Sequence, residues 1–261
     1  MDLVIAILIP LVFVVMLVVE WRFPAKKLPK VRFWLLKGIV FFVISGMTNG
    51  LLPVGVGALF RGWSAVHLAG IGIVPGALIG FVVADFVGYW FHRTEHRLLR
   101  LWRWTHQMHH SAERMDLAGM SYAHPLDTLL GFGLPAIATQ LFGFSADAVA
   151  LAGFFGFATV VFQHMNVRTP RLLGWILMRP EAHALHHERG IHAYNYGSSP
   201  LWDAVFGTYR NPAGFPEQYG FWDGASARVT SMLLGRDVGE PETTSAHAVS
   251  DVRGEGAVGD G

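Results

Sequence analysis

The sequence predicts an all-α integral membrane protein with about four or five transmembrane helices and a cytoplasmic, histidine-rich metal-binding cap. Hydrophobic residues make up 52% of the 261 positions, more than an ordinary soluble domain carries. They gather in runs long enough to cross a bilayer. Thirteen histidines lie mostly in short clusters between those runs. The formal net charge of +1 and the lack of a basic tract give no indication of a nucleic-acid partner.

The first apolar run covers residues 3–19 and approaches the ~20 residues that span a bilayer. A cleaved secretory signal is the alternative, but Asp2 stands where a positive charge is expected and no small-x-small cleavage pattern follows. We therefore expect an uncleaved helix. Residues 34–52 and 68–91 are expected to form the next two spans. A paired stretch at 126–163, broken near Gly143, is expected to form the last two.

The basic residues predict the orientation, because cytoplasmic loops are enriched in Lys and Arg. Such residues follow the first, third and fifth spans, whereas the segment after the second span carries only Arg61. The N-terminus is therefore expected outside and the three basic segments inside. We expect a membrane domain at 1–224 with a histidine core at about 85–209. The remainder, 225–261, is rich in Gly, Ser, Thr and acidic residues and is expected to be a disordered tail.

Three histidine boxes carry the chemistry. The first is an H-x-x-x-H pair at the end of the third span, and the other two share the spacing H-x-x-H-H. The eight residues are His92, His96, His106, His109, His110, His183, His186 and His187. On helices these spacings place imidazoles on shared faces. One such pair alone is more often structural, but three boxes on one expected side of the membrane favour a metal site.

His164 leaves the fifth span on the same expected side and is a candidate ninth ligand. His67 in the opposite loop and His247 in the tail are expected to be surface histidines. The chain has no cysteine, so a metal must take nitrogen or oxygen ligands. Eight or nine imidazoles exceed what one ion coordinates, which predicts two metals. Zinc hydrolysis needs about three protein ligands, so the surplus favours a redox pair of iron ions with dioxygen as co-substrate.

In order and in placement between apolar runs, the boxes resemble the fatty acid hydroxylase and sterol desaturase superfamily. The resemblance covers residues 85–209. It includes Asp85-Phe-Val-Gly-Tyr-Trp-Phe-His92, His124-Pro-Leu-Asp127, Asn195-Tyr-Gly197, Leu201-Trp-Asp203 and Phe206-Gly-Thr208. It implies a membrane-bound di-iron enzyme that uses O2 to hydroxylate or desaturate a lipid: a fatty acyl chain, a sterol or related isoprenoid, or an ether lipid. Electrons would come from a separate protein.

The resemblance also implies that the eight box histidines bind iron and that His164 is a ligand between the second and third boxes. Some fatty acid hydroxylases have a further histidine where this chain has Arg168. His192 is either a compensating ligand or a polar neighbour of the site. His124 is either a ligand or supporting residue, or part of a helix start. Asn195 is a further candidate for a supporting role.

Two acidic residues lie close to the first box. Asp85, two helical turns before His92, is expected to hydrogen-bond a ligand imidazole from behind, with a polar contact between helices as the alternative. Glu95 is expected to face solvent or arginines.

Two other functions remain open from the sequence. An intramembrane zinc hydrolase would be expected to carry H-E-x-x-H, which this chain lacks. A metal transporter or sensor would carry ionisable residues along several spans, whereas here Asp85 is nearly alone.

Overall fold

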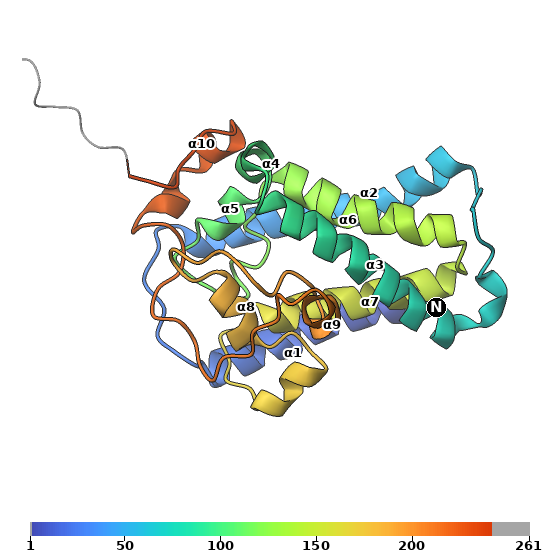
Figure 1. Ribbon diagram of the computed structural model, residues 1–261, viewed down its shortest axis with the longest axis horizontal. Coiled ribbons are helices and arrows are strands. Elements are labelled where there is room, and N and C mark those ends of the chain that lie inside the picture. Colours follow the sequence, from blue (N-terminus) through green and yellow to red (C-terminus); the bar gives the residue numbers. More distant parts are fainter. Residues whose placement is uncertain (1, 242–261) are drawn as a thin grey trace, which may run out of the picture.

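The computed structural model describes residues 2–241, and this part of the chain is helical throughout, with two isolated β-bridges and no strand (Figure 1). Five long helices form a bundle: α1 (Asp2–Arg22), α2 (Trp34–Phe60), α3 (Ile73–Glu95), α6 (Pro125–Phe142) and α7 (Ala146–Gln163). Short helices gather at one end and along one side: α4 (Leu99–Trp104), α5 (Gln107–His110), α8 (Pro180–His186), α9 (Pro200–Val205) and α10 (Val229–Leu233). Three 3-10 turns, η1 (Ala69–Ile71), η2 (Arg171–Trp175) and η3 (Ala225–Ala227), complete the described elements.

Helix α3 lies at the centre of the bundle. It packs against α6 on one side and α7 on the other, while α2 packs on α6 and α1 packs on α7. The end of α3 therefore meets the exit of α7 and the entrance of α6 at the same end of the bundle (Figure 1). This end carries the short helices of the cap, so residues far apart in the sequence meet there.

Four helices are long and apolar enough to cross a membrane: α1, α2, α3 and α7. Their apolar side chains are largely exposed, and only 6% of the apolar window of α1 is buried, as expected for helices that face lipid rather than water. Helix α6 has 18 residues but is not among the four. The prediction of a multi-spanning all-α protein is confirmed, with four candidate spans by length and composition.

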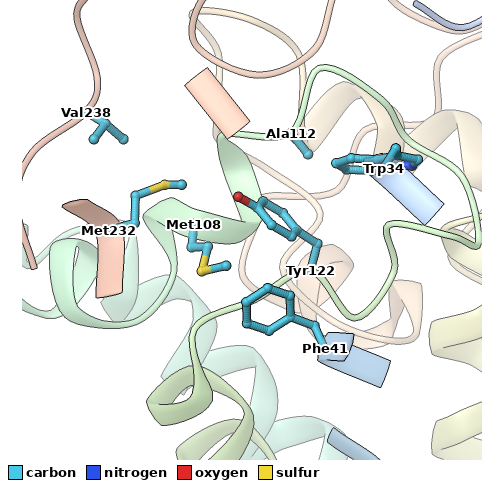
Figure 2. Close-up of a cluster of buried hydrophobic side chains, with 7 residues drawn as sticks. All are labelled: Trp34, Phe41, Met108, Ala112, Tyr122, Met232 and Val238. Atoms are coloured by element: carbon cyan, nitrogen blue, oxygen red, sulfur yellow. The ribbon is translucent and has the colours of Figure 1, made fainter. Parts of the chain in front are cut away.

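The cap has an apolar core of its own (Figure 2). Tyr122 and Met108 are completely buried in it, and Met232 of α10 closes one side. The hydroxyl of Tyr122 donates to the carbonyl of Ser226 at 2.7 Å. The members of this core are Trp34, Phe41, Met108, Ala112, Tyr122, Met232 and Val238.

The expected boundary of a disordered tail at residue 225 is wrong. Met232 and Val238 lie in the cap core, and η3 and α10 are formed within residues 225–233. Two buried apolar residues among many small and acidic ones gave too weak a hydrophobic pattern to be recognised. Residues 242–261, including His247, lie outside the described residues.

Candidate metal centre

The nine candidate ligands come from four elements at the cap end of the bundle. His92 lies in the last turn of α3 and His96 caps it, while His106, His109 and His110 belong to the turn of α5. His164 is the residue that caps the end of α7. His183, His186 and His187 lie on or immediately after α8, whose first turn begins with Pro180, a residue suited to helix starts.

The structure gathers all nine into two groups. One contains five histidines, His92, His96, His106, His110 and His186, and the other contains four, His109, His164, His183 and His187. In each group the ligand nitrogens lie within 4.8 Å of one another. Each group can therefore hold one metal ion.

The division follows helix geometry. Residues four apart share a helix face, and each such pair, 92 with 96, 106 with 110 and 183 with 187, stays within one group. The middle histidine of each H-x-x-H-H box, His109 or His186, joins the other group. The second and third boxes thus each contribute to both groups and tie them into one centre.

Backbone carbonyls fix the tautomers of several rings. Nδ1 of His92 donates to the carbonyl of Tyr196 at 2.7 Å, and Nδ1 of His186 donates to that of Tyr194 at 2.7 Å. In the second group, Nδ1 of His164 donates to the carbonyl of Val160 at 2.8 Å. Because a carbonyl only accepts, the hydrogen must sit on Nδ1 and Nε2 is left as a bare lone pair.

Nε2 atoms of the second group face one another. The Nε2 atoms of His109 and His164 are 3.2 Å apart, and those of His164 and His183 are 3.3 Å apart. Nδ1 of His109 and Nδ1 of His164 both donate to backbone carbonyls, so the two Nε2 atoms of this pair cannot hydrogen-bond to each other. The separation matches neighbouring ligands of one ion, since metal–nitrogen bonds of ~2.1 Å place them about 3 Å apart.

Buried nitrogens without partners point to the same conclusion. Nε2 of His186 and Nε2 of His187 have no hydrogen-bond partner among the described residues, although both side chains are almost completely buried. Buried polar atoms are normally paired. A cation in each group would satisfy them, so the donor set fits two metal ions.

Burial keeps these rings neutral. It lowers the pKa of His109 and of His164 to about 4. Burial also holds the pKa of His183 and of His187 well below the ordinary value, and neighbouring imidazoles add to the effect. Neutral imidazole is the form that binds metal. The centre is therefore ready to coordinate cations at neutral pH.

Two carboxylates support His106, and sequence reasoning missed this role for both. Asp127, at the start of α6, accepts from Nδ1 of His106 at 2.9 Å. The expectation that Glu95 faces solvent or arginines is wrong: it is 1% exposed, and its Oε2 lies 3.6 Å from the same nitrogen. The His-Pro-Leu-Asp motif was the available signal for Asp127. Glu95 lies between His92 and His96 in the sequence, and this position did not indicate that its side chain points inward.

Asp85 does not hydrogen-bond an imidazole, which corrects the expected role. It accepts from the backbone N–H of Ser198 at 2.7 Å and of Ser199 at 3.3 Å, and from Oγ of Ser199 at 2.5 Å. The loop held in this way presents the carbonyl of Tyr196 to His92. Asp85 therefore acts on the ligand through the loop rather than by direct contact.

The same loop contains residues in strained conformations. His192, Tyr194 and Asn195 have φ of 43°, 68° and 49°, in the left-handed region that non-glycine residues rarely adopt. Asn195 holds the loop: it donates to the carbonyl of Ala182 at 2.7 Å and accepts from the backbone of Arg210 at 2.7 Å. Nδ1 of His192 lies 3.0 Å from Nδ1 of His110, so His192 is a polar neighbour of the first group rather than a member of it.

His124 and His67 lie outside both groups. Nδ1 of His124 accepts from the backbone N–H of Leu126 at 3.1 Å and caps the start of α6, which is the helix-start role. His67 lies 2.9 Å from Oγ of Ser64 in the connection between α2 and α3. His67 therefore lies at the end of the bundle opposite the two histidine groups.

A buried ion pair fixes the start of α8. Arg179 and Glu181 are each 1% exposed and approach to 3.0 Å. Arg179 also donates to the carbonyl of Thr169 at 2.8 Å and to Oδ1 of Asn211 at 2.6 Å. These bonds set the position from which α8 delivers the third box.

Comparison with known proteins gives a family. The family described as fatty acid hydroxylase matches residues 77–208, about half of the sequence and all nine histidines of the two groups. The chain belongs to the fatty acid hydroxylase family. The resemblance inferred from the histidine boxes is thereby confirmed. No solved structure gave a significant match.

Curated relatives of this fatty acid hydroxylase family member act on several lipids according to their names. It is 34% identical over 144 residues to an ornithine lipid hydroxylase of Rhizobium tropici, covering 52% of this chain and 42% of that protein. Identity is 31% to an alkylglycerol monooxygenase of Xenopus tropicalis, over 49% of this chain and 29% of the relative. The sequence identity is 30% to a sphinganine C4-monooxygenase of Arabidopsis thaliana, over 51% of this chain and 53% of the relative. The chain thus matches only about a third to a half of the length of these relatives.

Proposed function

We propose that this protein is a membrane-bound di-iron enzyme that uses O2 to hydroxylate a lipid. The observation that carries the proposal is the division of nine histidines, six buried and three half-buried, into a group of five and a group of four whose ring nitrogens face one another. Family membership supports hydroxylation over desaturation, because the relatives are named hydroxylases and monooxygenases.

Iron is the proposed metal in both groups. Imidazole nitrogen suits iron, zinc and copper alike, but a hydrolytic zinc centre needs about three protein ligands and one ion. Two adjacent nitrogen-rich groups are better suited to a redox pair. A pair of iron ions, when bound, supplies the redox chemistry by which dioxygen oxidises an unactivated C–H bond.

The residues of the chain have three tasks in this chemistry. The nine imidazoles hold the metals, His92 and His186 being oriented by the carbonyls of Tyr196 and Tyr194. Asp127 holds the hydrogen of His106 on Nδ1 and strengthens the ring as a donor. The buried surroundings exclude water, which protects a reactive centre from side reactions.

The substrate is proposed to reach the centre from the bilayer, since the metal groups lie at the ends of membrane-spanning helices. We also propose that the cap faces the cytoplasm. Basic residues follow α1 and α3 on the cap side, and cytoplasmic loops are enriched in such residues. A separate cytoplasmic electron-transfer protein would supply the electrons.

Lipid extracts test the proposal. Cells expressing the wild-type chain under 18O2 are expected to accumulate a lipid heavier by one labelled oxygen atom, detected by mass spectrometry. His109→Ala and His186→Ala, one from each group, should abolish the product while membrane insertion is retained. His67→Ala is the matched control, since its ring is remote from both groups. A fully active His109→Ala, His186→Ala double variant would exclude the proposed centre.

A further inference from the structure

Helix α9 has the reverse of the polarity expected for a short helix on a water-facing cap. Its carboxylate, Asp203, is completely buried. Its apolar side chains point outward, with Leu201, Val205 and the following Phe206 exposed by 44%, 60% and 37%. An outward apolar face next to membrane spans indicates contact with lipid rather than water.

Contacts with α3 fix the depth of α9. Nε1 of Trp202 donates to the carbonyl of Val82 at 3.3 Å, and Asp85 accepts from the two residues that precede α9. Val82 lies about 20 Å and Asp85 about 15 Å from the cap end of α3 at ~1.5 Å per residue. A span takes ~20 residues and α3 has 23. Both contacts therefore fall within the spanning part, whichever end protrudes.

The backbone that leads into α9 meets the requirement for entering hydrocarbon, where every polar group needs a partner from the protein. The N–H groups of Tyr196 and Gly197 donate to the carboxylate of Asp203 at 2.9 and 2.7 Å. Those of Ser198 and Ser199 donate to Asp85. Pro200 has no N–H to satisfy. Four consecutive amides are thus paired by two buried carboxylates.

The apolar surface continues onto η2. Leu172, Trp175 and Ile176 are exposed by 78%, 76% and 73%. The hydroxyl of Tyr209 donates to the carbonyl of Gly174, which ties η2 to the segment after α9. A Cβ on Gly174 would lie 2.6 Å from that hydroxyl, so this close approach requires glycine.

The edge of η2 has the composition of a membrane interface. Arg168 precedes η2 and Arg171 is its first residue, and both are exposed. The exposed Trp175 is its last residue. Tryptophan and basic side chains are enriched where a bilayer meets water on the cytoplasmic side. Figure 1 places α9 alongside the bundle rather than at its cap end.

We propose that α9 and η2 form a lipid-facing shelf embedded in the cap-side leaflet of the bilayer. Helix α9 enters the leaflet beside α3 as a re-entrant element, and η2 lies at the headgroup level. The shelf begins at the loop whose Tyr196 carbonyl accepts from Nδ1 of His92. Lipid tails on the shelf would therefore lie next to the loop that borders the first histidine group. This placement does not depend on which metal the centre binds or on the reaction.

The absence of cysteine from the sequence permits a direct test. Val205→Cys and Trp175→Cys are each labelled with an NBD fluorophore in lipid nanodiscs. Quenching by brominated acyl chains is compared with quenching by aqueous iodide. Val43→Cys, on the exposed face of α2, is the lipid control. Asp223→Cys, with a side chain 89% exposed, is the aqueous control.

The shelf predicts that the label at position 205 is quenched by brominated lipid as at position 43. The label at position 175, at the headgroup level, should be quenched by brominated lipid more than at position 223, and iodide quenching of both labels should be weaker than at position 223. Iodide quenching of either label at the level of position 223 would overturn the proposal, because that side chain would be in water. Protection of either label from both quenchers would also overturn it, since a protein surface such as a second copy of the chain would then cover the site.

Discussion

The Nε2 atoms of His109 and His164 face each other at 3.2 Å while both Nδ1 atoms are hydrogen-bonded to backbone carbonyls. The two residues are 55 positions apart in sequence and come from α5 and the end of α7. Two bare lone pairs at this distance repel unless a cation lies between them. The relationship therefore supports a cation site in this group, where an ion would relieve the repulsion between the two nitrogens.

Removing one histidine of this pair should release metal. His109→Ala takes one of four ligands from the second group, and we expect a large loss of bound metal, measured by elemental analysis of purified protein. His124→Ala is a useful comparison, because this ring caps α6 without joining either group. Equal metal content in His109→Ala and wild type would contradict the assignment.

Asp127 should contribute to metal affinity without touching the metal. Asp127→Ala leaves Nδ1 of His106 without its carboxylate partner, and losses of such partners typically weaken metal binding by about 10–100-fold. Asp127→Asn keeps an acceptor oxygen and should retain more affinity. Competition with a chelator of known affinity measures the difference. Metal retention unchanged in Asp127→Ala would show that the carboxylate is dispensable.

Asp85 should act through the loop. Asp85→Leu leaves the buried N–H groups of Ser198 and Ser199 unpaired, at a cost of about 1–3 kcal/mol each. We expect a lower melting temperature in detergent and weaker metal retention. Asp85→Asn preserves the accepting oxygen and should lie close to wild type. If both variants behaved alike, the hydrogen bonds to the loop would not be the cause.

The buried Arg179–Glu181 pair should be essential for folding of the cap. Arg179→Ala leaves Glu181 buried without its counterion, which typically costs about 3–5 kcal/mol. Thermal unfolding followed by loss of monodisperse protein measures the effect. The pair of Arg189 with Asp223 is the control: the Asp223 side chain is 89% exposed, so Asp223→Ala removes an ion pair worth little. A melting temperature unchanged by Arg179→Ala would be incompatible with this role.

The metal-free protein should lose stability in acid. Burial lowers the pKa of His109 and His164 to about 4, below the ~6.5 of an unfolded histidine. The fold therefore favours the neutral rings, a contribution fully present above pH 6.5 and lost as the pH falls from 6.5 toward 4, by up to about 3 kcal/mol per ring. Melting temperatures of chelator-treated protein between pH 7.5 and 5 test this, and no decline would argue against buried neutral imidazoles.

The sequence predicted the membrane helices and the histidines that gather at the cap end because both depend on local patterns. Apolar runs predict spans, and the spacing of His92 with His96 or His183 with His187 predicts shared helix faces. The assignment of His186 to the group of His92, rather than to that of its own neighbours, depends on how α8 meets α3. Periodicity within one segment carries no information on that contact.

The supporting residues were harder to predict for the same reason. Asp85 was expected to contact an imidazole, but the loop that follows Tyr196 lies against α3 and takes its hydrogen bonds. Glu95 was expected outside, but α6 brings Asp127 close to it and the start of α5 brings His106 close to it. Helix α10 was missed because it is five residues long and has one buried residue, Met232, which gives no clear pattern.

Metal analysis of anaerobically purified protein tests the central claim most directly, with wild type and His109→Ala compared in parallel. The account predicts close to two irons per chain in the wild type, in accord with the two histidine groups, and a clear loss in the variant. One zinc per chain, or no bound metal in the wild type, would contradict it.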